Sequence, residues 1–208
     1  MNSDGPLKVD IWSDYVCPFC YLQLAIIDQL QQEYGSRITV QWHAFELRPE
    51  PLATLDPSAD YLRATWRQAI YPMAQKRKVL MKLPPVQPRS RNVLEAAAFA
   101  KVHGKFEAFH KEAFRAFFEF GRDIGDILVL LEVGSRAGLD RQALNSALSN
   151  HHYTDQIVAD EGLADELGLR AVPAFLIRRA DQPLSEATVM NGTMGIGPFK
   201  REIDRLCA

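Results

Sequence analysis

The sequence is poor in cysteine, has no excess of basic residues and contains no long apolar run. Only 3 of its 208 residues are cysteine, too few for a disulfide-stabilised scaffold. The 24 lysine and arginine residues face 26 aspartate and glutamate residues, which gives a formal net charge of −2. A nucleic-acid-binding domain usually carries a basic excess instead. No apolar run approaches the ~20 residues of a membrane-spanning helix. We therefore expect neither a nucleic-acid partner nor a membrane partner.

The N-terminal segment also lacks the pattern of a secretory signal peptide. Residues 1–12 contain neither a basic stretch nor the apolar stretch that follows it in such signals, so the expected location is the cytoplasm. The composition, with 47% hydrophobic and 24% charged residues, is that of an ordinary globular protein. A chain of 208 residues fits one domain, or a domain with a sizeable insertion.

Two of the three cysteines are closely spaced. Cys17 and Cys20 form a C-x-x-C motif, and Cys207 is the penultimate residue. Such a motif can be a redox-active dithiol, one half of a zinc site, or a coincidence. A structural zinc site needs two further ligands, and the sequence offers no second C-x-x-C pair. We therefore expect no metal. Whether the motif is a redox-active dithiol depends on the sequence pattern around it.

The hydrophobic pattern predicts an α/β fold that a helical block interrupts. Strands are expected at residues 8–12 and 37–43, with a helix between them that begins at the C-x-x-C motif. Strands return at 171–177 and 187–190, preceded by a helix at 153–167 and followed by one at 198–206. Between these two parts every periodic segment is helical: 58–77, 90–103, 105–120, 126–137 and 140–149.

The position of the C-x-x-C motif at a helix start has a chemical consequence. The thiolate is the nucleophilic form of cysteine, and unpaired backbone N–H groups at a helix N-terminus stabilise it. Cys17, expected at the exposed lip of the helix, should gain most from this. Cys20, one turn further in, should be buried and less acidic. Pro18 suits the first helical position because its ring presets φ and its missing N–H would have no partner there.

The string SDYVCPFCY, followed by an amphipathic helix, resembles the active-site segment of thioredoxin-fold disulfide oxidoreductases. The helical block resembles the insertion of the DsbA-like branch. The segments FELRP at 45–49 and KFEAFHKEAFRAFFEFGRDIGD at 105–126 resemble the FrnE-like dithiol–disulfide isomerases within that branch. The resemblance implies a discontinuous thioredoxin-like core, residues 1–50 and 151–208, with residues 51–150 as the insertion.

The resemblance also implies a set of site residues. Cys17 would attack a substrate disulfide and Cys20 would resolve the mixed disulfide, with no organic cofactor. The partners would be protein or small-molecule thiols and disulfides, including glutathione as a co-substrate. Val172-Pro173 matches the family's substrate-binding cis-proline, which faces the dithiol.

Four further residues would modulate the dithiol. Pro18 and Phe19 stand between the cysteines, where strongly oxidising DsbA enzymes carry Pro-His, which implies a less oxidising couple. Asp10 lies where relatives place a buried acid that moves the proton of the buried thiol; its alternative is a hydrated carboxylate at the strand end. Asp14 is expected to be a loop or capping residue.

Two other functions stay open. One is a glutathione-dependent isomerase or transferase of the kappa/hydroxychromene-carboxylate type, which shares this architecture but generally has serine at the nucleophile position. The other is a chaperone or binding protein whose dithiol only senses the redox state.

Overall fold

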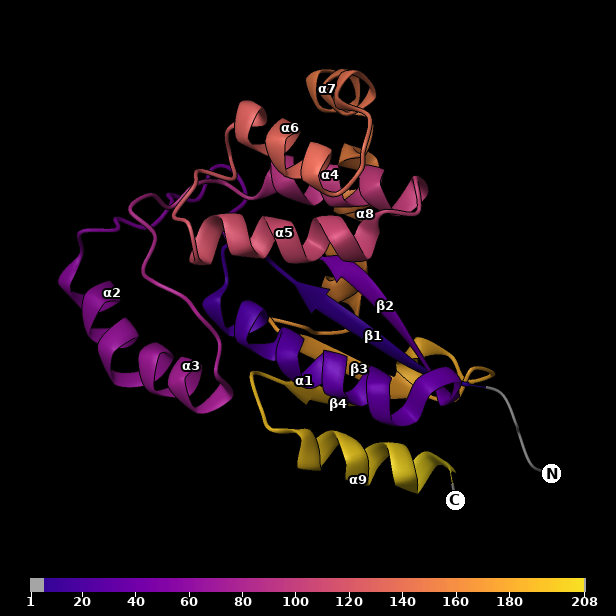
Figure 1. Ribbon diagram of the computed structural model, residues 1–208. Helices are drawn as coiled ribbons and strands as arrows, with labels where there is room; N and C mark the ends of the chain where they lie inside the picture. Colours follow the sequence, from indigo (N-terminus) through magenta and orange to yellow (C-terminus); the bar gives the residue numbers. More distant parts are fainter. Residues whose placement is uncertain (1–5, 208) are drawn as a thin grey trace.

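The computed structural model describes residues 6–207, and these form a four-stranded mixed sheet between two layers of helices (Figure 1). The strand order is β2-β1-β3-β4. The strands β1 (Leu7–Ser13) and β2 (Ile38–Ala44) run parallel, while β3 (Ala174–Arg178) is antiparallel to β1 and β4 (Thr188–Asn191) is antiparallel to β3. This is the α/β thioredoxin-like arrangement that the sequence predicts.

One face of the sheet is covered by the helices α1 (Pro18–Tyr34) and α9 (Ile196–Cys207), which lie side by side in Figure 1. Side chains of a strand alternate between its two faces, so Val9 and Ile11 of β1 point toward this layer. They pack with Ile27 of α1 and Phe199 of α9 into a fully buried cluster. The first helix ends at Gly35, whose φ of 54° suits a residue without a Cβ atom.

The opposite face is covered by a larger helical layer. It contains α4 (Arg91–Val102), α5 (Phe106–Phe118), α6 (Ile127–Arg136), α7 (Arg141–Ser149) and α8 (Thr154–Glu166). Trp12 of β1 is fully buried against this layer. The aromatic stripe of α5 belongs to the same core, since Phe109, Phe114 and Phe117 have no exposed surface.

A third group of helices stands at the end of the sheet where α1 begins (Figure 1). It consists of α2 (Asp60–Thr65) and α3 (Tyr71–Arg77), joined by the π-helical turn Trp66–Ile70. The pattern at 58–77 predicts one regular helix, whereas the structure widens it by this turn. Single π-turns inside helices are frequent at functional sites.

Most other boundaries agree with the sequence, and two short 3₁₀ turns, Gly35–Arg37 and Leu184–Glu186, complete the chain. The strand expected at 171–177 begins only at Ala174, because the Pro173 nitrogen has no hydrogen to donate to a strand ladder. Between residues 90 and 150, all of which the structure describes, there is no strand. Among residues 6–207, no helix is long and apolar enough to cross a bilayer. The domain boundaries near residues 50 and 150 stay a prediction.

Candidate active site

Cys17 and Cys20 lie at the junction between β1 and α1. The loop after Ser13 is closed by a hydrogen bond from the Cys17 N–H to the Asp14 carbonyl oxygen, 3.1 Å long. Cys17 is the N-cap of α1 and Pro18 occupies its first turn, as expected. Both Cys17 and Cys20 are free thiols.

The structure corrects the expected exposure of Cys17. The residue is only 4% exposed and does not stand on an open lip. Its Sγ donates a hydrogen bond to the Val172 carbonyl oxygen at 3.6 Å, so the loop before β3 covers it. The Val172–Pro173 peptide bond is cis. Val172, 155 positions away in sequence, therefore lies beside Cys17, while the substrate-binding role of Val172 and Pro173 stays a prediction.

Cys20 is more deeply buried, with 1% of its surface exposed. Burial raises the pKa of its thiol well above the ordinary value, and the neighbouring Cys17 thiol raises it further. The Asp14 backbone N–H and the Ser13 hydroxyl act in the opposite direction, since they stabilise the thiolate. The net effect keeps Cys20 protonated, which agrees with the expected lower acidity of the inner cysteine.

Asp14 is a loop residue, as expected, but it is also completely buried. Its carboxylate accepts hydrogen bonds from the backbone N–H groups of Leu47, at 2.8 Å, and Val16, at 3.2 Å. Burial raises the pKa of this carboxyl from 3.8 to about 6, although these hydrogen bonds and the Ser90 hydroxyl lower it. Asp14 therefore changes its charge near neutral pH, directly beside the dithiol loop.

The two sequence interpretations of Asp10 are both incomplete. Its carboxylate is not hydrated, because the residue is 1% exposed. It accepts hydrogen bonds from His43 Nε2 at 2.9 Å and Arg178 Nε at 3.3 Å, so charged partners from β2 and β3 engage it. His43 Nδ1 lies 3.0 Å from Asp160 Oδ1 of α8. The result is a buried ionic network across the sheet, and this network sets the environment of Asp10.

Within this network, His43 has a raised pKa. Burial alone lowers it, but the hydrogen bonds with Asp10 and Asp160 and the charges of the two carboxylates outweigh burial. The imidazole also stacks on the Trp12 ring, with 4.3 Å between the ring centroids. No local pattern pairs His43 with either carboxylate, since they lie 33 and 117 positions away in the chain.

Cys17 opens onto a cavity of about 320 Å³, which we call the apolar cavity. Most of its walls are apolar, and among the described residues that line it only Arg48 carries a charge. Phe19, between the cysteines, forms part of the wall next to Cys17, and Val172 forms another. The remaining large apolar walls come from the insertion and its flanks: Leu55, Leu62, Trp66, Ile70 and Phe118. Sequence analysis missed these residues, because apolar residues at helical spacing look the same in a core and in a pocket wall.

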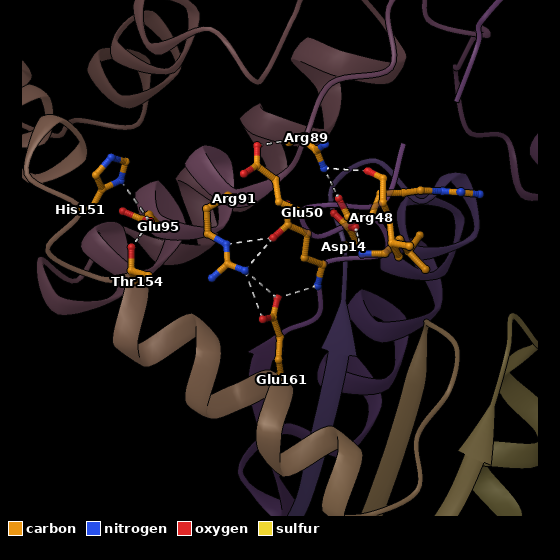
Figure 2. Close-up of polar contacts among 12 residues, drawn as sticks. Asp14, Arg48, Glu50, Arg89, Arg91, Glu95, His151, Thr154 and Glu161 are labelled. Atoms are coloured by element: carbon orange, nitrogen blue, oxygen red, sulfur yellow. Dashed lines mark hydrogen bonds and ion pairs between the residues drawn. The ribbon is translucent and has the colours of Figure 1, made fainter. Parts of the chain in front are cut away.

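The segment that carries Leu47 and Arg48 is fixed to the helical layer by an ionic cluster (Figure 2). The Arg91 guanidinium of α4 lies 2.8 Å from Glu46 and 3.2 Å from Glu161 of α8. Figure 2 shows Arg91 pointing toward Glu161. Glu46 is almost completely buried, and the Glu161 carboxylate also accepts the Glu46 backbone N–H at 3.2 Å. This cluster fixes the segment that forms part of the apolar cavity wall. It also positions the Leu47 N–H for its hydrogen bond to the Asp14 carboxylate. In the part of the chain that the structure describes, no three His, Cys, Asp or Glu side chains group as metal ligands would.

Comparison with known proteins agrees with this site. Residues 8–200 match the DSBA-like thioredoxin domain family. The chain belongs to this family. DSBA-like proteins are thiol–disulfide oxidoreductases, which suits the dithiol, the proline loop and the helical layer described above. The FrnE-like branch stays a prediction.

Individual relatives of this DSBA-like chain cover nearly its whole length. The uncharacterized protein YwbO of Bacillus subtilis is 35% identical over 201 residues, which are 95% of this chain and 96% of the relative. A 2-hydroxychromene-2-carboxylate isomerase structure superimposes with a TM-score of 0.78 at 20% identity and covers 96% of both chains. The cytosolic disulfide reductase DsbM of Pseudomonas aeruginosa gives a TM-score of 0.69 at 19% identity, covering 96% of this chain and 95% of DsbM. At such identities the two structures share the fold with this chain.

Proposed function

We propose that this protein exchanges disulfides in cytoplasmic client proteins, with Cys17 as the attacking residue and Cys20 as the resolving residue. The observation that carries the proposal is the placement of Cys17. It caps a helix, borders the Val172–Pro173 loop and opens onto the apolar cavity. The sulfur chemistry itself needs no organic cofactor and no metal. The cytosolic location of the similarly folded DsbM supports the compartment.

The exchange takes place in two steps. The Cys17 thiolate attacks one sulfur of the client disulfide, so a Cys17–client disulfide forms and the other client sulfur leaves as a thiolate. Cys20 then loses its proton and attacks the Cys17 sulfur, which releases the second client thiolate and leaves a Cys17–Cys20 disulfide. The client gains two electrons and the protein loses them; run backwards, the same steps oxidise a client dithiol.

The asymmetry of the two cysteines supports this assignment of roles. Cys17 borders a cavity that a substrate can enter, whereas Cys20 is screened and its pKa is raised by burial. A client strand that pairs with the Val172 backbone would position its sulfur beside Cys17.

The apolar cavity favours protein clients over glutathione. Glutathione carries two carboxylates and one ammonium group, and Arg48 alone offers a charge in the wall. An apolar side chain next to a client cysteine would instead be removed from water there, worth roughly 1.5–3 kcal/mol for a large residue. We therefore expect clients with an aromatic or aliphatic residue beside the reactive cysteine.

A trapping experiment tests this function. In a Cys207→Ser background, which removes the exposed third thiol, we expect Cys20→Ser to accumulate mixed disulfides with clients through Cys17. Cys17→Ser should trap nothing and should abolish the reduction of insulin. Non-reducing electrophoresis and mass spectrometry would identify the trapped clients. If Cys20→Ser traps nothing while Cys17→Ser keeps full activity, the dithiol is not the reactive centre.

The main alternative is a glutathione-dependent isomerase, and the fold shared with 2-hydroxychromene-2-carboxylate isomerase favours it. An apolar cavity beside the nucleophile also suits an aromatic small molecule. The presence of both Cys17 and Cys20 argues against it, because an isomerase of this type needs no resolving thiol. Calorimetric titration with glutathione separates the two functions: tight binding without mixed-disulfide formation would support the isomerase.

A further inference from the structure

A second, larger groove borders the apolar cavity. Its volume is about 940 Å³, and Pro88 lines both the groove and the apolar cavity. The segments 46–50 and 87–89 also contribute residues to both. The other walls of the groove come from α4, from α8 and from the turn before α6. A client chain that occupies the apolar cavity beside Cys17 can therefore continue into this groove.

Carboxylates outnumber cations in the walls of this groove. Its lysine, arginine, aspartate and glutamate residues are Glu46, Glu50, Glu95, Asp123, Asp126, Arg89 and Arg91. Each arginine is already paired with a glutamate, Arg91 with Glu46 at 2.8 Å and Arg89 with Glu50 at 3.4 Å. The other three carboxylates have no lysine or arginine partner among residues 6–207. We call this surface the acidic groove.

Glu95 of α4 is the buried carboxylate of the acidic groove, since none of its surface is exposed. Its Oε1 accepts a hydrogen bond from the Thr154 hydroxyl at 2.5 Å, but its Oε2 has no hydrogen-bond partner among residues 6–207. Glutamate is almost never fully buried unless it is paired. An ammonium or guanidinium group brought by a ligand would supply the missing partner.

The His151 side chain lies beside this carboxylate and is 66% exposed (Figure 2). Its Nδ1 is 3.6 Å from Glu95 Oε1, which is longer than a hydrogen bond. The residue has a φ of 51°, in the left-handed region that side chains other than glycine rarely adopt. The turn before α8 thus places an exposed ring next to Glu95 without a hydrogen bond to hold it there, so a client side chain can displace it.

Two more exposed carboxylates are fixed in place at the start of α6. Asp123 Oδ1 accepts the Gly125 N–H at 2.9 Å, and Asp126 Oδ1 accepts the Leu128 N–H at 2.8 Å. The second oxygen of each carboxylate has no partner among residues 6–207 and is available to a cation. Charge pairs at exposed positions are worth less than buried ones, so these two residues would add weaker contacts.

We propose that the acidic groove binds a basic segment of the client polypeptide, with a lysine or arginine side chain at Glu95, while the client cysteine reacts with Cys17. The proposal rests on the function proposed above and specifies its substrates further. Such clients have an apolar residue beside the reactive cysteine, for the apolar cavity, and a positive charge further along the chain.

Peptide disulfides of different charge test the acidic groove. Each peptide carries a cysteine as a mixed disulfide with thionitrobenzoate, a neighbouring phenylalanine, and a pair of lysines, glutamines or glutamates a few residues before or after the cysteine. The protein carries Cys20→Ser and Cys207→Ser, so that only Cys17 reacts. Its thiolate attacks the peptide sulfur, the peptide disulfide breaks, and coloured thionitrobenzoate leaves with the electron pair.

We expect one of the two lysine peptides to react roughly ten-fold faster than the matching glutamine peptide, the factor that one hydrogen bond to a charged group is worth. The gain should appear as a lower KM and should shrink as the salt concentration rises. The glutamate peptide should be slower than the glutamine peptide.

Charge-neutralising variants locate the effect. Glu95→Gln keeps an acceptor for the Thr154 hydroxyl and should remove most of the lysine advantage, while an unchanged rate with the glutamine peptide shows that the fold is intact. Asp123→Asn should reduce the lysine advantage by about two-fold, which keeps the test independent of the folding of Glu95→Gln. Glu132→Gln removes the same charge outside the groove, from an exposed pair with Arg122, and should change nothing.

Two results would contradict the assignment of the acidic groove. Equal rates for the lysine and glutamine peptides, or a lysine advantage that neither groove variant reduces, would overturn it and leave the proposed function intact. A protein whose Cys17 releases no thionitrobenzoate from any of the peptides would instead refute the proposed function itself.

Discussion

Asp14 gives the sharpest stability prediction, because its carboxyl is both buried and held by backbone hydrogen bonds. Burial raises its pKa from 3.8 to about 6. At 1.36 kcal/mol per pKa unit, ionising this side chain is about 3 kcal/mol less favourable in the folded protein than in the unfolded chain. We therefore expect the free energy of unfolding to carry a penalty of about that size wherever Asp14 is ionised.

The pH window follows from the two pKa values. Below about pH 4 the carboxyl is protonated in both states, and the penalty is absent. Between about pH 4 and pH 6 only the folded protein holds the proton, so stability falls as the pH rises. Above about pH 6 both states are ionised and the penalty is complete. An Asp14→Asn side chain does not titrate, so this slope should vanish in the variant.

The measurement is urea unfolding of the reduced protein at a series of pH values. The unfolding free energy of the parent minus that of Asp14→Asn should fall by about 3 kcal/mol between about pH 3 and pH 7. Subtracting the variant cancels the other titrating groups and leaves a constant term for the acceptor that Asn loses. Asp56→Asn serves as a control, because Ser58 lowers the pKa of that exposed carboxyl and the slope should not have the same sign. A difference that stays flat over this range would show that burial does not perturb Asp14.

Three further outcomes are expected. Asp10→Asn should destabilise the protein by about 3–5 kcal/mol in urea unfolding, because it leaves the buried Arg178 without its carboxylate, whereas Asp28→Asn in the exposed pair with Lys111 should cost under about 1 kcal/mol. His43→Gln should lower stability most below about pH 6.5, where the paired imidazolium is fully formed, and the loss should shrink as the pH rises through the raised pKa of His43; a pH-independent loss would contradict the ionic network. Phe19→Ala should raise the KM for peptide disulfides with an aromatic neighbour by roughly ten-fold and leave kcat nearly unchanged, with the half-exposed Phe120→Ala as the control; equal KM values would remove the apolar cavity from substrate binding.

The local sequence pattern was sufficient to predict the strands and the helix that carry the dithiol. The β-forming residues at 8–12 and the alternation at 37–43 became β1 and β2, and the apolar spacing after Cys20 became the buried face of α1. The helix bounds at Pro18 and Gly35 are also local effects. The proline ring presets φ and lacks an N–H, and glycine tolerates a positive φ, so each acts within one turn. The C-x-x-C motif fixed the two sulfurs one turn apart.

Other properties of the site depend on neighbours that are distant in sequence. Cys17 is covered because Val172 folds back over it, although helix geometry alone predicts an exposed sulfur. Asp10 and Asp14 differ by only four positions, yet one pairs with His43 and Arg178 while the other is surrounded by backbone N–H groups. The local sequence does not distinguish these environments.

The sequence by itself determined the elements, the dithiol and its position at a helix start, because these follow from interactions within a few residues. Only the tertiary structure decided which side chains surround the sulfurs, since burial and charge depend on strands and helices that pack from elsewhere in the chain. The apolar cavity takes its walls from α2, the π-turn and α5. Burial and neighbouring polar groups set the pKa values of Asp14, Cys20 and His43, and with them the chemistry open to the dithiol.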